Sequence, residues 1–271
     1  MSKINEKGTA LITGASSGIG AVYADRLAKR GYDLILVARN GDRLQALSRR
    51  LVAETGHTVE AIKADLNDKG DLARIEARLK GDHAITLLVN NAGVGATAPL
   101  LSSDVEKMDD MIRLNVTALT RLTYAAVPRF VERGRGTIIN IASIVAITPE
   151  ALNGVYGATK AFVLAFTHSL QHELSSKGVR VQAVLPGATA TDFWDAAGRP
   201  VHHLPKEIVM TAEDMVDAAL VGLDQGEIVT IPPLADDAEW VRFEAARRAM
   251  IGRLSSAIPA ARYTAAHRQS A

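Results

Sequence analysis

Residues 13–20 read Thr13-Gly14-Ala15-Ser16-Ser17-Gly18-Ile19-Gly20, and they lie between the apolar run Thr9–Thr13 and an amphipathic segment. In such a turn the first glycine permits a tight bend, the second leaves room for a pyrophosphate, and the third lets helix and sheet approach closely. The N-terminus of the following helix offers free N–H groups and a positive dipole end to phosphates. Because the strand–turn–helix context is the one required, the segment predicts a dinucleotide site. We assign to that site Gly14, Ser16, Ser17, Gly18, Ile19 and Gly20.

Short apolar runs alternate with longer amphipathic segments along the chain. The runs predict strands at Thr9–Thr13, Leu34–Ala38, Thr58–Ala64, Ile85–Asn90, Thr137–Ala142, Val179–Leu185 and Ile228–Ile231. The segments predict helices at Arg43–Glu54, Asp71–Leu79, Ser103–Glu132, Tyr156–Ser175 and Ala212–Asp224. Strands that are apolar on both faces and alternate with helices predict an α/β Rossmann fold, a doubly wound parallel sheet of about seven strands with helices on both faces. No low-complexity linker divides the chain, so we expect a single domain, 1–271.

Two regions interrupt this alternation. The connection 187–210 has no clear periodicity, and loops of that length are usually functional or mobile, so we predict a substrate loop. Residues 235–271 form a C-terminal extension that has a helical pattern over Asp236–Leu254. Its arginines fit either a solvated helix face or a contact between subunits.

Composition excludes several classes of protein. The 271 residues have a formal net charge of +1 and no cysteine. No global field therefore attracts nucleic acid, and disulfides, thiol catalysis and thiolate metal sites are excluded. The N-terminal segment before the first apolar run is short and polar. The longest apolar stretch, Ile138–Ile147, is too short to span a membrane. We expect a cytoplasmic protein without a membrane span or a nucleic-acid partner.

The second predicted strand ends at Ala38-Arg39-Asn40, without the acidic residue that binds the ribose 2′-hydroxyl in many NAD sites. Arg39 offers a planar cation to a 2′-phosphate, so we favour NADP(H) over NAD(H), with a surface arginine as the alternative. The third and fourth strands end at Asp65-Leu66 and at Asn91-Ala92-Gly93. Ligands of open α/β sheets lie outside the carboxyl ends of the strands, so we include these residues in the cofactor site. Asp65 could instead cap the next helix.

Tyr156 and Lys160 are four residues apart in a predicted helix and therefore share one face. An ammonium beside a phenol favours the phenolate, so the spacing predicts a lowered tyrosine pKa and proton exchange with an alcohol near neutral pH. Ser143, at a strand end, could hold the same substrate oxygen. These three residues predict carbonyl–alcohol interconversion.

The histidines give only weak support for a metal site. His168 and His172 have the i, i+4 spacing of a ligand pair, but no third ligand is evident, and His202-His203 is no more persuasive. We predict no metal.

Together these motifs resemble the short-chain dehydrogenase/reductase family. The resemblance spans about Gly8 to Thr191 and rests on the order of these motifs along the chain and on the spacing between them. It comprises Thr-Gly-x-x-x-Gly-Ile-Gly at 13–20, Asn-Asn-Ala-Gly at 90–93, Asn115, Ser143, Tyr-x-x-x-Lys at 156–160, and Pro186-Gly187 with Thr191.

The resemblance implies roles for the four catalytic candidates. Tyr156 would be the general acid in reduction and the base in oxidation, and Lys160 would lower its pKa and bind the nicotinamide ribose. Ser143 would orient the substrate carbonyl. Asn115 would position a water that links Lys160 to solvent.

The resemblance also completes the cofactor site and suggests an assembly. Pro186 and Gly187 would shape the nicotinamide pocket, and Thr191, to which we add Thr189, would contact the carboxamide or the phosphates. Family members usually form dimers or tetramers, often through the two long helices, so we expect a homodimer or homotetramer.

Mostly apolar residues are candidates for the substrate pocket: Ile144, Val145, Leu152, Asn153, Phe193 and Trp194. They favour an uncharged ketone or aldehyde, and an NADPH preference favours reduction. Two alternatives remain. A non-catalytic NADP(H) sensor would bind cofactor without turnover, and an epimerase would regenerate its cofactor within one turnover.

Overall fold

The computed structural model describes residues 7–263. One parallel sheet has the strand order β3-β2-β1-β4-β5-β6-β7. Its strands are β1 Thr9–Thr13, β2 Asp33–Ala38, β3 Val59–Lys63, β4 Ile85–Asn90, β5 Gly136–Ile141, β6 Val179–Val184 and β7 Val229–Thr230. The order confirms the predicted doubly wound Rossmann fold. The chain starts at β1, moves outward to β3 and returns to the other side at β4, so the switch point between β1 and β4 opens a crevice at the strand ends.

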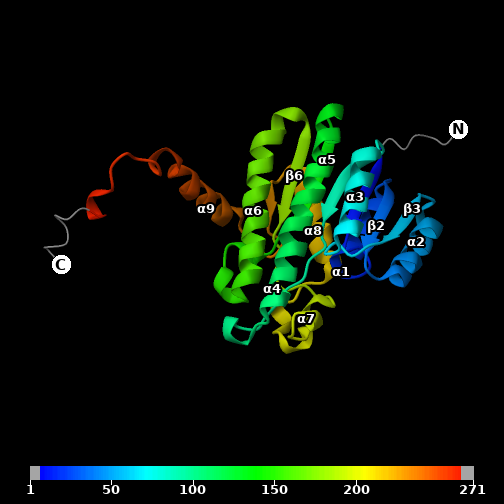
Figure 1. Cartoon of the computed structure of the whole chain (residues 1–271), viewed down its shortest axis with the longest axis horizontal. Helices are drawn as coiled ribbons and strands as arrows, with labels where there is room; N and C mark the ends of the chain where they lie inside the picture. The colour runs from blue at the N-terminus through cyan, green and yellow to red at the C-terminus, as the bar shows by residue number, and fades with distance from the viewer. Residues whose placement is uncertain (1–6, 264–271) are drawn as a thin grey trace. The chain divides into compact units, whose positions relative to one another are not determined.

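Helices cover both faces of the sheet (Figure 1). One face packs against α1 Gly18–Lys29, α2 Gly41–Thr55 and α8 Ala212–Gln225. The other packs against α3 Lys69–Gly81, α5 Leu119–Arg133 and α6 Gly154–Leu174. Buried aliphatic side chains from the two sides of each central strand enter the two cores, which explains why these strands are apolar throughout.

The predicted helix Ser103–Glu132 is present with one irregularity. It consists of α4 Val105–Ile112, a π-helical turn Arg113–Ala118, and α5. π-helical turns inside α-helices are rare and frequently mark functional sites. This one includes Asn115, a catalytic candidate.

The connection 187–210 contains short structured elements. These are α7 Phe193–Ala196 and the 3₁₀ turns Val201–His203 and Lys206–Ile208. A parallel bridge joins Thr189 to Met210, which brings the two ends of the connection together.

The chain divides into two compact units, of which the first ends at Pro233 and the second begins at Leu234. The first contains the whole sheet. The second contains α9 Asp237–Ala249 and corresponds to the predicted extension 235–271, whose residues 264–271 lie outside the described residues. No helix within residues 7–263 has both the length and the apolar character needed to cross a membrane.

Candidate active site

A cavity of ≈ 1160 Å³ runs along the carboxyl ends of the strands, from the glycine turn to the connection 187–210. The predicted cofactor residues line it, with Gly20 as the exception. The lining includes Gly14, Ser16, Ser17, Gly18, Ile19, Arg39, Asp65, Leu66, Asn91, Ala92, Gly93, Tyr156, Lys160, Pro186, Gly187, Thr189 and Thr191.

The glycines after β1 answer different steric needs. Gly14 and Gly18 have φ of +66° and +52°, a region that favours glycine. A Cβ at Gly18 would also lie 2.9 Å from Thr191 Cγ2. A Cβ at Gly20 would overlap Gly14 O and lie 2.5 Å from Asn91 Nδ2. Gly20 therefore lets α1 approach the sheet, as expected for the third glycine of the turn, and it does not line the cavity.

The N-terminus of α1 can accept an anion. Ser17 occupies the N-cap without a side-chain capping bond, and no acidic residue lies in the first turn. The neighbouring α2 differs, because Asn40 Oδ1 accepts from Arg43 N at 3.0 Å and Asp42 lies in its first turn. The helix that faces the cavity thus offers its first N–H groups and its dipole to a phosphate, as a dinucleotide site requires.

Arg39 lines the cavity beyond the end of β2, together with Arg43. Arg43 Nη1 lies 2.9 Å from Asp192 Oδ2, so an ion pair spans from α2 to the connection 187–210. Asp65 Oδ1 accepts from Asn67 N at 3.0 Å, whereas Asp68 caps α3. The alternative of Asp65 as a helix cap is therefore wrong.

The three residues proposed for proton transfer lie together. Ser143 follows β5, and its Oγ donates to Pro186 O at 3.4 Å. Tyr156, which α6 presents with only 6% of its surface exposed, lies near enough for the Ser143 hydroxyl to lower its pKa. Lys160, one turn along α6, donates from Nζ to Ile141 O at 2.9 Å. The same Nζ lies 5.8 Å from the centre of the Tyr156 ring. A strand end and a helix thus bring serine, phenol and amine to one place.

The predicted effect of Lys160 on the tyrosine is wrong in this structure. Burial raises the pKa of Tyr156 to about 12, although the hydrogen bond with Ser143 lowers it in part. Burial lowers the pKa of Lys160 to about 8. Loss of water disfavours the charged form of each group, so the neutral phenol is the favoured form near pH 7.

Asn115 lies behind the cavity wall with 2% of its surface exposed and does not line the cavity. Its Oδ1 accepts from Val94 N at 3.0 Å, and its Nδ2 donates to Val94 O at 2.8 Å and to Thr159 Oγ1 at 3.1 Å. A Cβ at Gly93 would lie 3.1 Å from Asn115 Oδ1 and 3.5 Å from Lys160 Nζ. The missing side chain of Gly93 therefore leaves room beside Asn115 and Lys160, and the water link to Lys160 stays a prediction.

The substrate end of the cavity is lined by Ile144, Val145, Leu152, Phe193 and Trp194. Asn153 does not line it, and a substrate contact for Asn153 stays a prediction. Its Oδ1 caps α6, and its Nδ2 donates to Ala98 O and Ser103 Oγ. Sequence reasoning missed Val94, Gly95, Leu204, Ile208 and Met210, which also line the cavity.

Comparisons with known proteins show the family to which the chain belongs. The family model for short chain dehydrogenases matches residues 8–201. A short-chain dehydrogenase from Sphingobium yanoikuyae in complex with NADPH is 50% identical, with a TM-score of 0.92 over 95% of this chain and 100% of that one. A bulky-bulky ketone specific alcohol dehydrogenase from Comamonas testosteroni is 45% identical, with a TM-score of 0.87 over 94% of this chain and 98% of that one. An oxidoreductase of Staphylococcus epidermidis is 33% identical over 85% of this chain and 96% of its own length.

Proposed function

The chain belongs to the short-chain dehydrogenase/reductase family of oxidoreductases, and we propose that it reduces uncharged, bulky ketones with NADPH. The observation that supports this most is the continuity of one cavity. It begins at an anion-binding helix N-terminus, passes Ser143 and Tyr156, and ends among apolar side chains. This order of groups along the cavity is the one that a hydride-transfer site would need.

The residues present fit the cofactor. The N-terminus of α1 would bind the pyrophosphate, because its N–H groups are uncapped and no acid opposes an anion there. Arg39 would bind the 2′-phosphate. Pro186, Gly187, Thr189 and Thr191 would bind near the nicotinamide end, and Lys160 would bind its ribose. When bound, NADPH supplies the hydride, and the protein supplies orientation and a proton.

Ser143 and Tyr156 would bind the substrate carbonyl oxygen together. Their hydroxyl groups stabilise that oxygen as negative charge develops on it, and Tyr156 donates its Oη proton to form the alcohol. Burial favours the neutral phenol, which is the form of Tyr156 that carries this proton. Asn115 would keep Lys160 linked to solvent for the return of the proton.

The substrate class is inferred from the walls of the cavity. Leu152, Val145 and Phe193 offer apolar surface, and the Comamonas relative is described as specific for bulky-bulky ketones. Hydrophobic pockets gain affinity from apolar substituents, so ketones with two sizeable apolar groups should bind better than small polar ones. We also infer a homodimer or homotetramer.

The test is NADPH oxidation across a panel of ketones and aldehydes, with Tyr156→Phe as the matched variant. We expect turnover by the wild type and none by Tyr156→Phe, with similar NADPH affinity in both. Turnover retained without the phenol would remove Tyr156 from the mechanism. Tight NADPH binding without turnover of any compound would favour the sensor, and inversion of an alcohol centre without net NADPH oxidation would favour an epimerase.

A further inference from the structure

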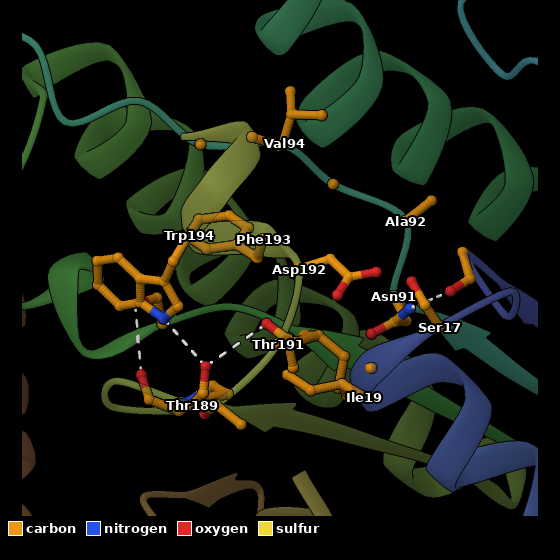
Figure 2. A pocket seen from close by; sticks show the side chains of 18 of the residues that line it. Ser17, Ile19, Asn91, Ala92, Val94, Thr189, Thr191, Asp192, Phe193 and Trp194 are labelled. Atoms are coloured by element: carbon orange, nitrogen blue, oxygen red, sulfur yellow. Dashed lines mark hydrogen bonds between the residues drawn. The ribbon is translucent and has the colours of Figure 1, made fainter. Parts of the chain in front are cut away.

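Phe193 lies directly against the residue proposed as proton donor. Its ring centre is 5.7 Å from that of Tyr156, and the two planes are tilted by 44°. It also meets Trp194 edge-on at 5.7 Å. Figure 2 shows both aromatic side chains of α7 at the cavity, with Phe193 on the side of Asp192 and Thr191. The Phe193 ring therefore forms part of the cover that leaves Tyr156 almost completely buried.

The position of this ring depends on Gly95. A Cβ at Gly95 would overlap Phe193 Cζ and lie 2.8 Å from Cε2. The backbone of Gly95 does not adopt a positive φ, so its conformation does not require glycine. The lack of a side chain at this position instead makes room for the tip of the ring.

Hydrogen bonds to two other segments hold α7, the helix that carries the Phe193 ring. Thr97 donates to Ala197 O twice, from N at 3.1 Å and from Oγ1 at 2.9 Å. Trp194 Nε1 donates to Thr189 O at 2.9 Å. These bonds hold α7 to the segment after β4 and to the connection after β6. Removal of the Phe193 ring should therefore change the cavity wall beside Tyr156 without releasing α7.

We propose that Phe193 is a specificity-determining residue whose ring limits the size of the substrate beside Tyr156. The space left by Gly95 allows the ring to take this position. This inference rests on the proposed ketone reductase activity. The larger substituent of a ketone bound at Tyr156 must share the space beside the phenol with the Phe193 ring. A smaller side chain at 193 therefore admits larger substituents, whereas a methyl group at 95 displaces the ring and changes the size limit through it.

The experiment compares the wild type, Phe193→Ala, Gly95→Ala and the double variant on acetophenone and benzophenone. The readout is the ratio of kcat/KM for benzophenone to that for acetophenone. We expect Phe193→Ala to raise this ratio about tenfold or more, the scale on which apolar pockets discriminate by size. Gly95→Ala should also change this ratio because it displaces the ring, and should change it by less than about twofold when Phe193 is already Ala.

Gly81→Ala is the matched control for the glycine change, because a Cβ there meets nothing within 4 Å and Gly81 does not line the cavity. Its ratio should equal that of the wild type. Equal changes for both ketones in Phe193→Ala, or a Gly95→Ala effect that persists without the ring, would overturn the proposal. Phe193→Leu gives the same test with a milder change in packing.

Ketone affinity separates this inference from the proposed function. The dissociation constants of both ketones are measured by tryptophan fluorescence in the presence of NADP⁺, with which the ketones are not reduced. The preference for benzophenone should rise in Phe193→Ala. Failure of the wild type to oxidise NADPH with either ketone would count against the proposed function alone. An affinity ratio that is the same in wild type and Phe193→Ala would overturn the size limit.

Discussion

Replacing Asn153 by Ala removes a side chain that joins the start of α6 to the segment before α4. Oδ1 accepts from Val155 N at 2.9 Å and from Tyr156 N at 3.4 Å. Nδ2 donates to Ala98 O at 2.7 Å and to Ser103 Oγ at 3.0 Å. The residue is 4% exposed, so water cannot readily replace these partners. The substitution therefore removes both a helix cap and a connection between two distant segments.

The expected loss in free energy of unfolding is about 3 kcal/mol. An N-cap contributes about 1 kcal/mol, and each of the two further hydrogen bonds contributes about 1 kcal/mol. Ser103 Oγ also donates to Ala98 O, which keeps that carbonyl satisfied and limits the cost. For a chain of this size, each kcal/mol lowers Tm by about 2–4 °C, so Tm should fall by about 6–12 °C.

Urea unfolding of four proteins measures this loss: the wild type, Asn153→Ala, Asn153→Ser and Asp68→Ala. Asp68 is the matched control, because it caps α3 through Asp71 N at 2.8 Å on an exposed surface, and its loss should cost about 1 kcal/mol. Asn153→Ser keeps a capping oxygen and should recover about 1 kcal/mol relative to Ala. If Asn153→Ala cost no more than Asp68→Ala, the two amide donor bonds would contribute nothing and the reasoning would fail.

Three further substitutions test the charged residues of the cavity. Arg39→Asp should shift the ratio of kcat/KM values from NADPH toward NADH, and an unchanged ratio would mean that Arg39 does not bind the 2′-phosphate. For Lys160→Met, the pKa of the wild-type amine is about 8 when folded, against an ordinary 10.5, so the unfolded chain binds more protons between these values. The free energy of unfolding of the wild type should therefore rise relative to Lys160→Met between pH 8 and 10.5, and a constant difference in urea titrations would contradict this. Asp192→Asn breaks the ion pair with Arg43 and, because both side chains are more than half exposed, should leave the unfolding free energy nearly unchanged, which a fall in Tm of several degrees would refute.

The elements that sequence reasoning located best have sharp local boundaries. β1 and β4 begin and end as predicted. The apolar run of β1 stops at Gly14, and that of β4 stops before Asn91. The glycine turn was predictable for the same reason, because each glycine answers a steric need within one strand–turn–helix unit. The residues at successive strand ends could be predicted to line the cavity from the topology of the sheet, and not from the chemistry of their side chains.

The features that sequence reasoning missed depend on contacts between distant segments. Asn153 precedes a helix, which is visible in the sequence, but its contacts with Ala98 and Ser103 are not. The fit of Phe193 to Gly95 joins two loops that follow different strands. The sign of the Tyr156 pKa shift was wrong because spacing reveals the neighbouring amine but not the burial, which is the main cause of the shift.

The opposite pKa shifts of Tyr156 and Lys160 bear on the direction of catalysis. Both have burial as their first cause, and both favour the neutral form. A reductase needs a protonated phenol when substrate binds, and a phenol with a pKa of about 12 meets that need throughout the neutral range. Oxidation needs the phenolate, which the same burial disfavours. The buried pair thus leaves the phenol in the protonated form from which reduction starts, and an NADPH-selecting Arg39 would favour the same direction.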